Sequence, residues 1–138
     1  MRFMILVKAN KDSEAGVMPP EELFTAMADY HEQLVKAGVL LDASGLQPSA
    51  KGWRIKYSGG KRIVIDGPFT EAKELVAGYT IIQVKSKEEA LEWSRRFPNP
   101  AIGGKDCEIE IRQLFELEDF GLSEAVGRFR EMGLATQK

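Results

Sequence analysis

The chain begins with a nearly continuous apolar run and then switches to a helical pattern. Residues 2–9 are typical of a strand covered on both faces. A polar loop is expected at 10–16, and Pro19-Pro20 followed by two glutamates is a typical helix start. Apolar residues then recur at helical spacing, at Leu23, Met27, Tyr30 and Leu34. Gly38 is expected to end this helix.

Two strand-like runs around a glycine pair predict a β-hairpin. Residues 53–57 alternate in polarity, residues 62–66 return, and Ser58-Gly59-Gly60 is a turn signal. If the two glycines form a two-residue turn, Trp53 pairs with Asp66 on one face. The hairpin segment is also basic, because no acid lies between Asp42 and Asp66. Its basic residues are Lys51, Arg54, Lys56, Lys61 and Arg62. They predict either a solubilised strand edge or an anion-attracting rim.

The second half repeats the strand–helix–strand pattern. Strands are expected at 75–84 and 108–117, after an earlier one that starts at 39–41. Between them, Ser86 and Glu89 have the spacing of a capping box. Residues 123–134 predict a short amphipathic helix, packed on its own chain or on a partner subunit.

The order of these elements predicts an α+β fold of the ferredoxin-like, split βαβ type with an inserted hairpin. Such a sheet has helices on one face only. The other face must be covered, and pairing with a second copy does this, so we expect a homodimer.

Composition narrows the functional classes. The 138 residues are 43% hydrophobic and 29% charged, as in a soluble globular domain. Nineteen basic against 21 acidic residues leave a net charge of −2, which argues against nucleic acid as a partner. One histidine and one cysteine exclude the common zinc frameworks, and we expect neither a metal nor another cofactor. The first apolar run is too short to span a membrane, so we expect a cytoplasmic protein with no membrane partner.

The segment after the hairpin carries a family resemblance. Residues 66–74 read Asp-Gly-Pro-Phe-Thr-Glu-Ala-Lys-Glu, which resembles the signature of the DGPF branch of the YCII-related family. Other segments match in the same order: Ala37-Gly38-Val39-Leu40-Leu41, Gly45-Leu46-Gln47-Pro48, Gly78-Tyr79, Ala90-Leu91-Glu92-Trp93 before Pro98, and Ile109-Glu110-Ile111-Arg112. The resemblance covers residues 1–121 and leaves 122–138 as a C-terminal helical extension. It implies a dimeric α/β-barrel.

The resemblance implies less about activity. It points to small-molecule chemistry through a His-Asp pair, which would use His31 and Asp66 as catalytic residues. It also points to an alternative, a non-catalytic ligand-binding or regulatory module, because genes of the DGPF branch often neighbour those of alternative sigma factors. A third hypothesis is a dimeric scaffold in which the DGPF turn is purely structural.

Each candidate residue has a structural alternative. His31 lies on the apolar stripe of its helix, where it is either a core histidine bonded to a backbone carbonyl or a general acid/base. Asp66 either closes an Asx-type turn or orients a ligand. The substrate-binding candidates are Trp53, Phe69, Glu71 and Lys73. Phe69 could instead plug the core, and Glu71 and Lys73 could be a solvated turn. We expect His31 and Asp66 to meet, with Trp53 or Phe69 as a wall.

Overall fold

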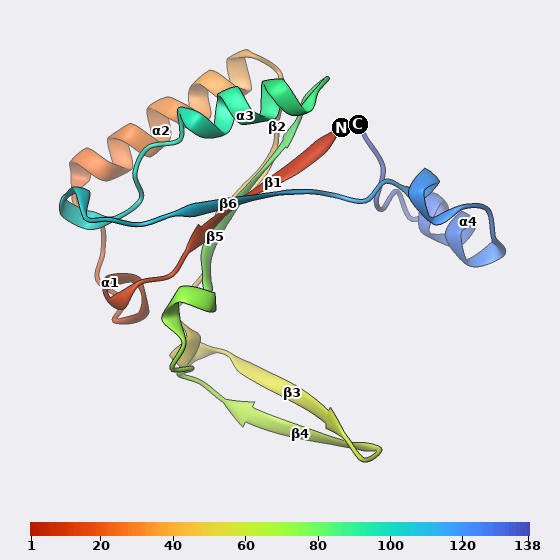
Figure 1. Cartoon of the computed structure of the whole chain (residues 1–138), viewed down its shortest axis with the longest axis horizontal. Coiled ribbons are helices and arrows are strands. Elements are labelled where there is room, and N and C mark those ends of the chain that lie inside the picture. The colour runs from red at the N-terminus through yellow and green to blue at the C-terminus, as the bar shows by residue number, and fades with distance from the viewer.

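A computed structural model describes residues 1–138 and contains one four-stranded sheet with helices on one side (Figure 1). All strand pairs are antiparallel, and the sheet order is β2-β5-β1-β6. The strands are β1 (Arg2–Lys8), β2 (Leu40–Gly45), β5 (Val76–Gln83) and β6 (Ile109–Gln113), and the covering helices are α2 (Glu21–Lys36) and α3 (Lys87–Arg95). The predicted α+β class is therefore confirmed.

The core lies between the sheet and the two helices. Its buried members are Phe3, Ile5, Tyr30, Leu34, Val39, Ile82, Val84 and Ala90. A fully buried aliphatic side chain such as Leu34 or Ile82 contributes about 2 kcal/mol to folding. The Tyr30 hydroxyl donates to the carbonyl of Trp93 at 2.7 Å and so ties α2 to α3. Burial raises the pKa of Tyr30 to about 12, so this tyrosine stays neutral at physiological pH.

Local signals in the sequence explain where the helices start. Ser86 accepts a hydrogen bond from the Glu89 amide at 3.1 Å, and Glu89 reaches back to the Lys85 amide at 3.0 Å. The predicted cap by Ser86 is therefore confirmed, whereas Glu89 bonds one residue further back than a capping box requires. The expected loop at 10–16 is wrong in part, because it contains the one-turn helix α1 (Lys11–Glu14). Its cause is a local capping box between Asn10 and Ser13.

The other face of the sheet has no covering layer in a single chain. Phe3 and Ile5 point into the core, so Met4 and Leu6 point to the open side, where they stay half-buried. Only 14 of the 138 residues are buried, and many large apolar side chains are exposed in the single chain. None of the helices has the length and hydropathy needed to cross a membrane.

The hairpin forms a separate two-stranded sheet that projects from the body (Figure 1). It consists of β3 (Trp53–Ser58) and β4 (Lys61–Asp66), and every residue in both strands is exposed. Trp53 pairs with Asp66, as predicted. The turn glycines have φ values of 56° and 76°. Two successive positive φ values are typical of a type I′ turn, and residues with a side chain rarely adopt them.

The C-terminal segment extends from the sheet and then returns to it. It contains the 3₁₀ turn Leu117–Phe120 and the helix α4 (Glu124–Glu131), which lies within the predicted range 123–134 and is capped by Ser123. The Leu117 amide donates to the Ala135 carbonyl at 3.0 Å, and the Lys138 amide donates to the Gln83 side chain at 2.8 Å. These bonds anchor the segment to its own chain.

Candidate functional site

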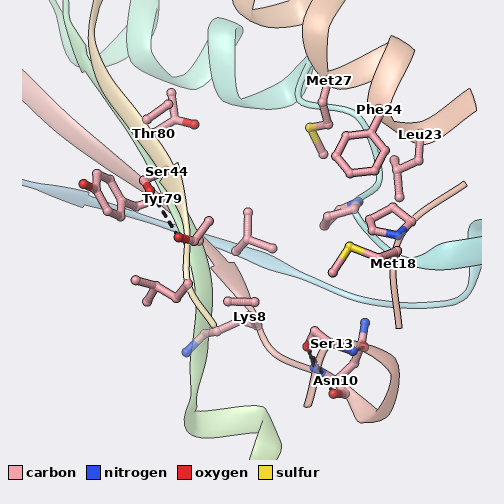
Figure 2. A pocket seen from close by; sticks show the side chains of 18 of the residues that line it. Lys8, Asn10, Ser13, Met18, Leu23, Phe24, Met27, Ser44, Tyr79 and Thr80 are labelled. Carbon is pink, nitrogen blue, oxygen red and sulfur yellow. Dashed lines mark hydrogen bonds between the residues drawn. The ribbon is translucent and has the colours of Figure 1, made fainter. Parts of the chain in front are cut away.

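A cavity of about 730 Å³ lies between α2, the segment 10–19 and the strands β2 and β5. Figure 2 shows Leu23, Phe24 and Met27 of α2 on one side of it and Ser44 and Thr80 on the strand side. The lining is mainly apolar. Its polar members are Lys8, Asn10, Ser13, His31, Ser44, Gln47 and Thr80. Size and lining are typical of a site for a small molecule that is held by a few polar groups.

His31 is fixed in this cavity by two hydrogen bonds. Its Nδ1 lies 2.7 Å from the carbonyl oxygen of Met27, and its Nε2 lies 2.9 Å from Oγ1 of Thr80. A carbonyl oxygen can only accept, so Nδ1 carries the proton. In the neutral ring Nε2 is then the basic nitrogen, and it accepts the hydroxyl proton of Thr80. The backbone therefore selects one tautomer of the only histidine.

The surroundings of the imidazole are aromatic and poor in charge. The ring packs edge-on against Tyr30 and Phe97, at centroid distances of 5.4 Å and 6.1 Å. Thr80 is only 2% exposed. The one ammonium group of the lining belongs to Lys8, and it lies 3.4 Å from Glu110. Hydrogen bonds from Arg112 and then Lys8 lower the pKa of Glu110, which favours the ionised carboxylate beside Lys8.

The structure does not bring Asp66 to His31 within one chain, which corrects the expected pair. Both ring nitrogens of His31 are engaged elsewhere, and Asp66 does not line the cavity. Its carboxylate is exposed and accepts no hydrogen bond, so the Asx-type turn is absent as well. The strand pairing behind the expectation is correct. The hairpin, however, projects away from the body, so a shared hairpin face is not a shared pocket.

The other candidates also lie outside the cavity. Trp53 is exposed, and the ring of Phe69 lies under the guanidinium of Arg54, with 3.8 Å between the guanidinium carbon and the ring centroid. Phe69 is half-buried there and does not belong to the core cluster. Glu71 and Lys73 are exposed and form no ion pair. Nothing in one chain gathers these four residues around a ligand.

The DGPF turn has a clear packing role. The Gly67 amide donates to the Gly52 carbonyl at 3.0 Å, and a Cβ on Gly67 would lie 2.7 Å from the carbonyl carbon of Ser49. The Phe69 amide donates to the Ser49 hydroxyl at 3.0 Å. Ser49 in turn donates its amide and its hydroxyl to the carboxylate of Glu14. The turn therefore pins the base of the hairpin to the 3₁₀ turn Ser49–Lys51 and to α1.

Comparison with known proteins gives the family. A family model described as the YCII-related domain matches residues 1–116. The chain belongs to the YCII-related family. An uncharacterized protein of Rhizobium meliloti (strain 1021) is 33% identical over 110 residues, covering 76% of this chain and 86% of that protein. Among solved structures, 5-chloro-2-hydroxyhydroquinone dehydrochlorinase from Burkholderia phenoliruptrix AC1100, in complex with 2,5-dihydroxybenzoquinone, matches with a TM-score of 0.43 and 13% identity. That match covers 84% of this chain and 95% of the other.

The match confirms the predicted family. In this YCII-related chain the matched region ends at residue 116, before α4. The expected division into residues 1–121 and an extension of 122–138 stays a prediction. Sequence reasoning missed Thr80, although one signal was present. Thr80 occupies the same strand face as the buried Ile82, and a hydroxyl at a core-facing position usually has a specific partner.

Proposed function

We propose that this YCII-related protein is a small-molecule enzyme in which His31 transfers a proton to or from a compound bound in the cavity. One observation carries the proposal. The only imidazole of the chain lines an apolar cavity, and the partner of its basic nitrogen is a single hydroxyl, that of Thr80, which lines the same cavity. An imidazole can both accept and donate a proton, so it suits both directions of transfer.

The two hydrogen bonds of His31 define a simple proton path. In the resting state Thr80 donates to Nε2, while Nδ1–H donates to Met27. A substrate hydroxyl or an acidic C–H group that reaches Nε2 can give up its proton there. The imidazolium that forms keeps its Nδ1–H bond to the Met27 carbonyl. Thr80 is then able to rotate and accept from the new Nε2–H. Such positioned acid–base catalysis typically contributes about 10²–10⁴-fold in rate.

The lining restricts the class of compound. Most side chains around the cavity that a ligand would touch are apolar, so the substrate body is largely apolar. Its reacting part is a hydroxyl or an acidified C–H group, such as that of a phenol or a small acid. Catalysis by Asp66, and substrate binding by Trp53, Phe69, Glu71 and Lys73, would require a second copy to carry its hairpin to this cavity.

The same proposal includes the assembly. The antiparallel order β2-β5-β1-β6, with both helices on one face, supports a ferredoxin-like sheet. Its open face carries half-buried apolar side chains, including Met4, Leu6 and Ile81. Face-to-face pairing of two copies would bury them and form a dimeric α/β-barrel.

A thermal-shift screen of small acids and phenols tests the ligand site. A compound that binds the folded state at about 100 times its Kd stabilises it by about 2.7 kcal/mol, which raises Tm. We expect such a shift for the wild type and its loss in His31→Gln. Glu32→Gln changes the adjacent exposed residue, which lies outside the cavity, and should keep the shift.

The outcomes separate the hypotheses. If His31→Gln unfolds the protein without any ligand, His31 is a structural residue. An unchanged shift in His31→Gln would place the ligand elsewhere and contradict the proposal. Each binding compound is then incubated with protein and followed by NMR. Chemical conversion by the wild type and not by His31→Gln supports the enzyme, whereas binding without conversion favours the ligand-binding module.

A further inference from the structure

The hairpin presents an apolar stripe that its own chain leaves exposed. The register places Trp53, Ile55 and Tyr57 on one face of the ribbon, together with Val64. Trp53 is 63% exposed and Tyr57 is 71% exposed. A lone two-stranded ribbon is marginally stable in water, and large apolar side chains on it mark a surface that is normally covered.

A second exposed apolar surface lies on the C-terminal segment. We define the tail patch by its exposed large apolar side chains: Phe115, Phe120, Leu122, Phe129, Met132 and Leu134. The rings of Phe115 and Phe120 pack together with their centroids 4.9 Å apart. Because Leu117 and Lys138 are bonded back to the same chain, the patch sits on an anchored element.

The two segments that carry these surfaces differ in net charge. Residues 51–66 of the hairpin region carry five basic side chains and one acidic one, a net charge of +4. Residues 115–138 carry five acidic and three basic side chains, a net charge of −2. Glu124 and Glu131, at the two ends of α4, have no ion-pair partner in their own chain. On the hairpin, Arg62 and Asp66 lie on the same face as the stripe, whereas Arg54, Lys56 and Lys61 lie on the opposite face. Attraction between the two oppositely charged segments favours their encounter.

The shape of the molecule places both surfaces on the side of a second copy. In Figure 1 the hairpin and α4 extend away from the layer of α2 and α3 and lie apart from each other, with the open side of the sheet between them. A chain therefore does not cover its own hairpin with its own tail. In a two-fold dimer, a contact between the hairpin of one copy and the tail of the other occurs twice.

We propose that the hairpin of one copy packs its apolar stripe on the tail patch of a second copy. The proposal rests on the dimer of the proposed function and names the contact that holds it. The family match ends at residue 116, so every residue of the tail patch except Phe115 lies outside the matched region. Two such arms would clamp the paired sheets from both sides.

Cross-linking of the full-length chain tests the contact. Cys107 is exposed, so the background is Cys107→Ser. Ser58→Cys places a thiol at the hairpin tip, next to Tyr57, and Ala125→Cys places one a helical turn before Phe129. Both original residues are exposed and lie outside the two apolar surfaces. The two variants are co-expressed and treated with a short bis-maleimide, and each is also treated alone. Glu88→Cys, at an exposed position on α3, replaces Ser58→Cys as a matched control.

We expect a covalent dimer from the mixture of Ser58→Cys and Ala125→Cys, and none from either variant alone or from the Glu88→Cys control. Cross-linking of Ser58→Cys alone would mean that two hairpins meet, which overturns the proposal, and so would cross-linking of Ala125→Cys alone. Light scattering on the same samples tests the dimer separately from the contact between the hairpin and the tail patch. A dimer without any cross-link overturns the contact and leaves the dimer intact. A monomer overturns both, and neither result bears on ligand binding by His31.

Discussion

Gly67→Ala is expected to lower the free energy of unfolding by about 3 kcal/mol, near the upper end of the usual cost of overpacking. The new Cβ would overlap the carbonyl group of Ser49, and backbone atoms cannot move aside as a flexible side chain can. Relief requires the base of the hairpin to move, which also breaks the bond from the Phe69 amide to Ser49. Urea unfolding measures the loss. Amide hydrogen exchange at Phe69 should become faster.

Gly52→Ala is the matched control for that substitution. A Cβ on Gly52 would approach the same carbonyl oxygen of Ser49 at 3.6 Å, which is an ordinary contact. Its φ of −116° also suits alanine. We therefore expect a change of at most about 1 kcal/mol, because Gly→Ala at a compatible position mainly restricts the unfolded chain. Equal losses for Gly52→Ala and Gly67→Ala would show that the close approach at Gly67 has no energetic weight.

Thr80→Val is expected to lower the free energy of unfolding by about 1–2 kcal/mol and to slow the proposed chemistry, but less than His31→Gln does, because Nε2 of His31 remains. Valine keeps the shape of threonine but removes the hydroxyl that donates to Nε2 of His31. A polar atom that loses its partner near the core costs about 1–3 kcal/mol, and His31 is only half-buried, which holds the loss toward the lower end. Conversion of a bound compound should fall by less than the roughly 10²–10⁴-fold that loss of the acid–base group itself would cause.

Thr80→Ser keeps the hydroxyl and is the matched control, with stability and conversion close to those of the wild type. Because the chain has one histidine, nitrogen NMR reads the state of Nδ1 and Nε2 without assignment overlap. The wild type and Thr80→Ser should show the same hydrogen-bonded Nε2, and Thr80→Val should not. If Thr80→Val matches the wild type in stability and in the Nε2 signal, the bond to Thr80 does not position His31.

Local patterns in the sequence were sufficient to predict most of the helices and strands. The apolar run at the start, the spacing from Leu23 to Leu34 and the cap at Ser86 all predict elements that the structure contains. Each signal acts over one or two turns of helix or one strand, where backbone preference and side-chain period agree. The hairpin register was predictable for the same reason. A two-residue glycine turn leaves one pairing of the flanking strands, so Trp53 meets Asp66.

The candidate site required contacts between distant parts of the chain. His31 and Thr80 are separated by 49 residues, and only the packing of α2 on β5 brings them together. From the sequence, Asp66 is the expected partner of His31, because the hairpin register gives the strand face on which Asp66 lies. The direction in which the hairpin leaves the body was not known. That direction depends on the contact of Gly67 with Ser49 and on the bonds from Ser49 to Glu14. None of these contacts leaves a periodic signal.

The sequence by itself determined the class of the fold, the family, the hairpin register and the presence of His31 on the apolar face of its helix. The tertiary structure decided the partner of His31, the outline of the cavity and the separation of Asp66 from both. The physical reason is the range of the interactions. Periodicity and turn chemistry act between neighbours along the chain and can be read in order. Whether His31 bonds to Thr80 or to Asp66 depends on which surfaces pack against each other. Packing joins residues whose spacing in the sequence carries no information about their distance in space.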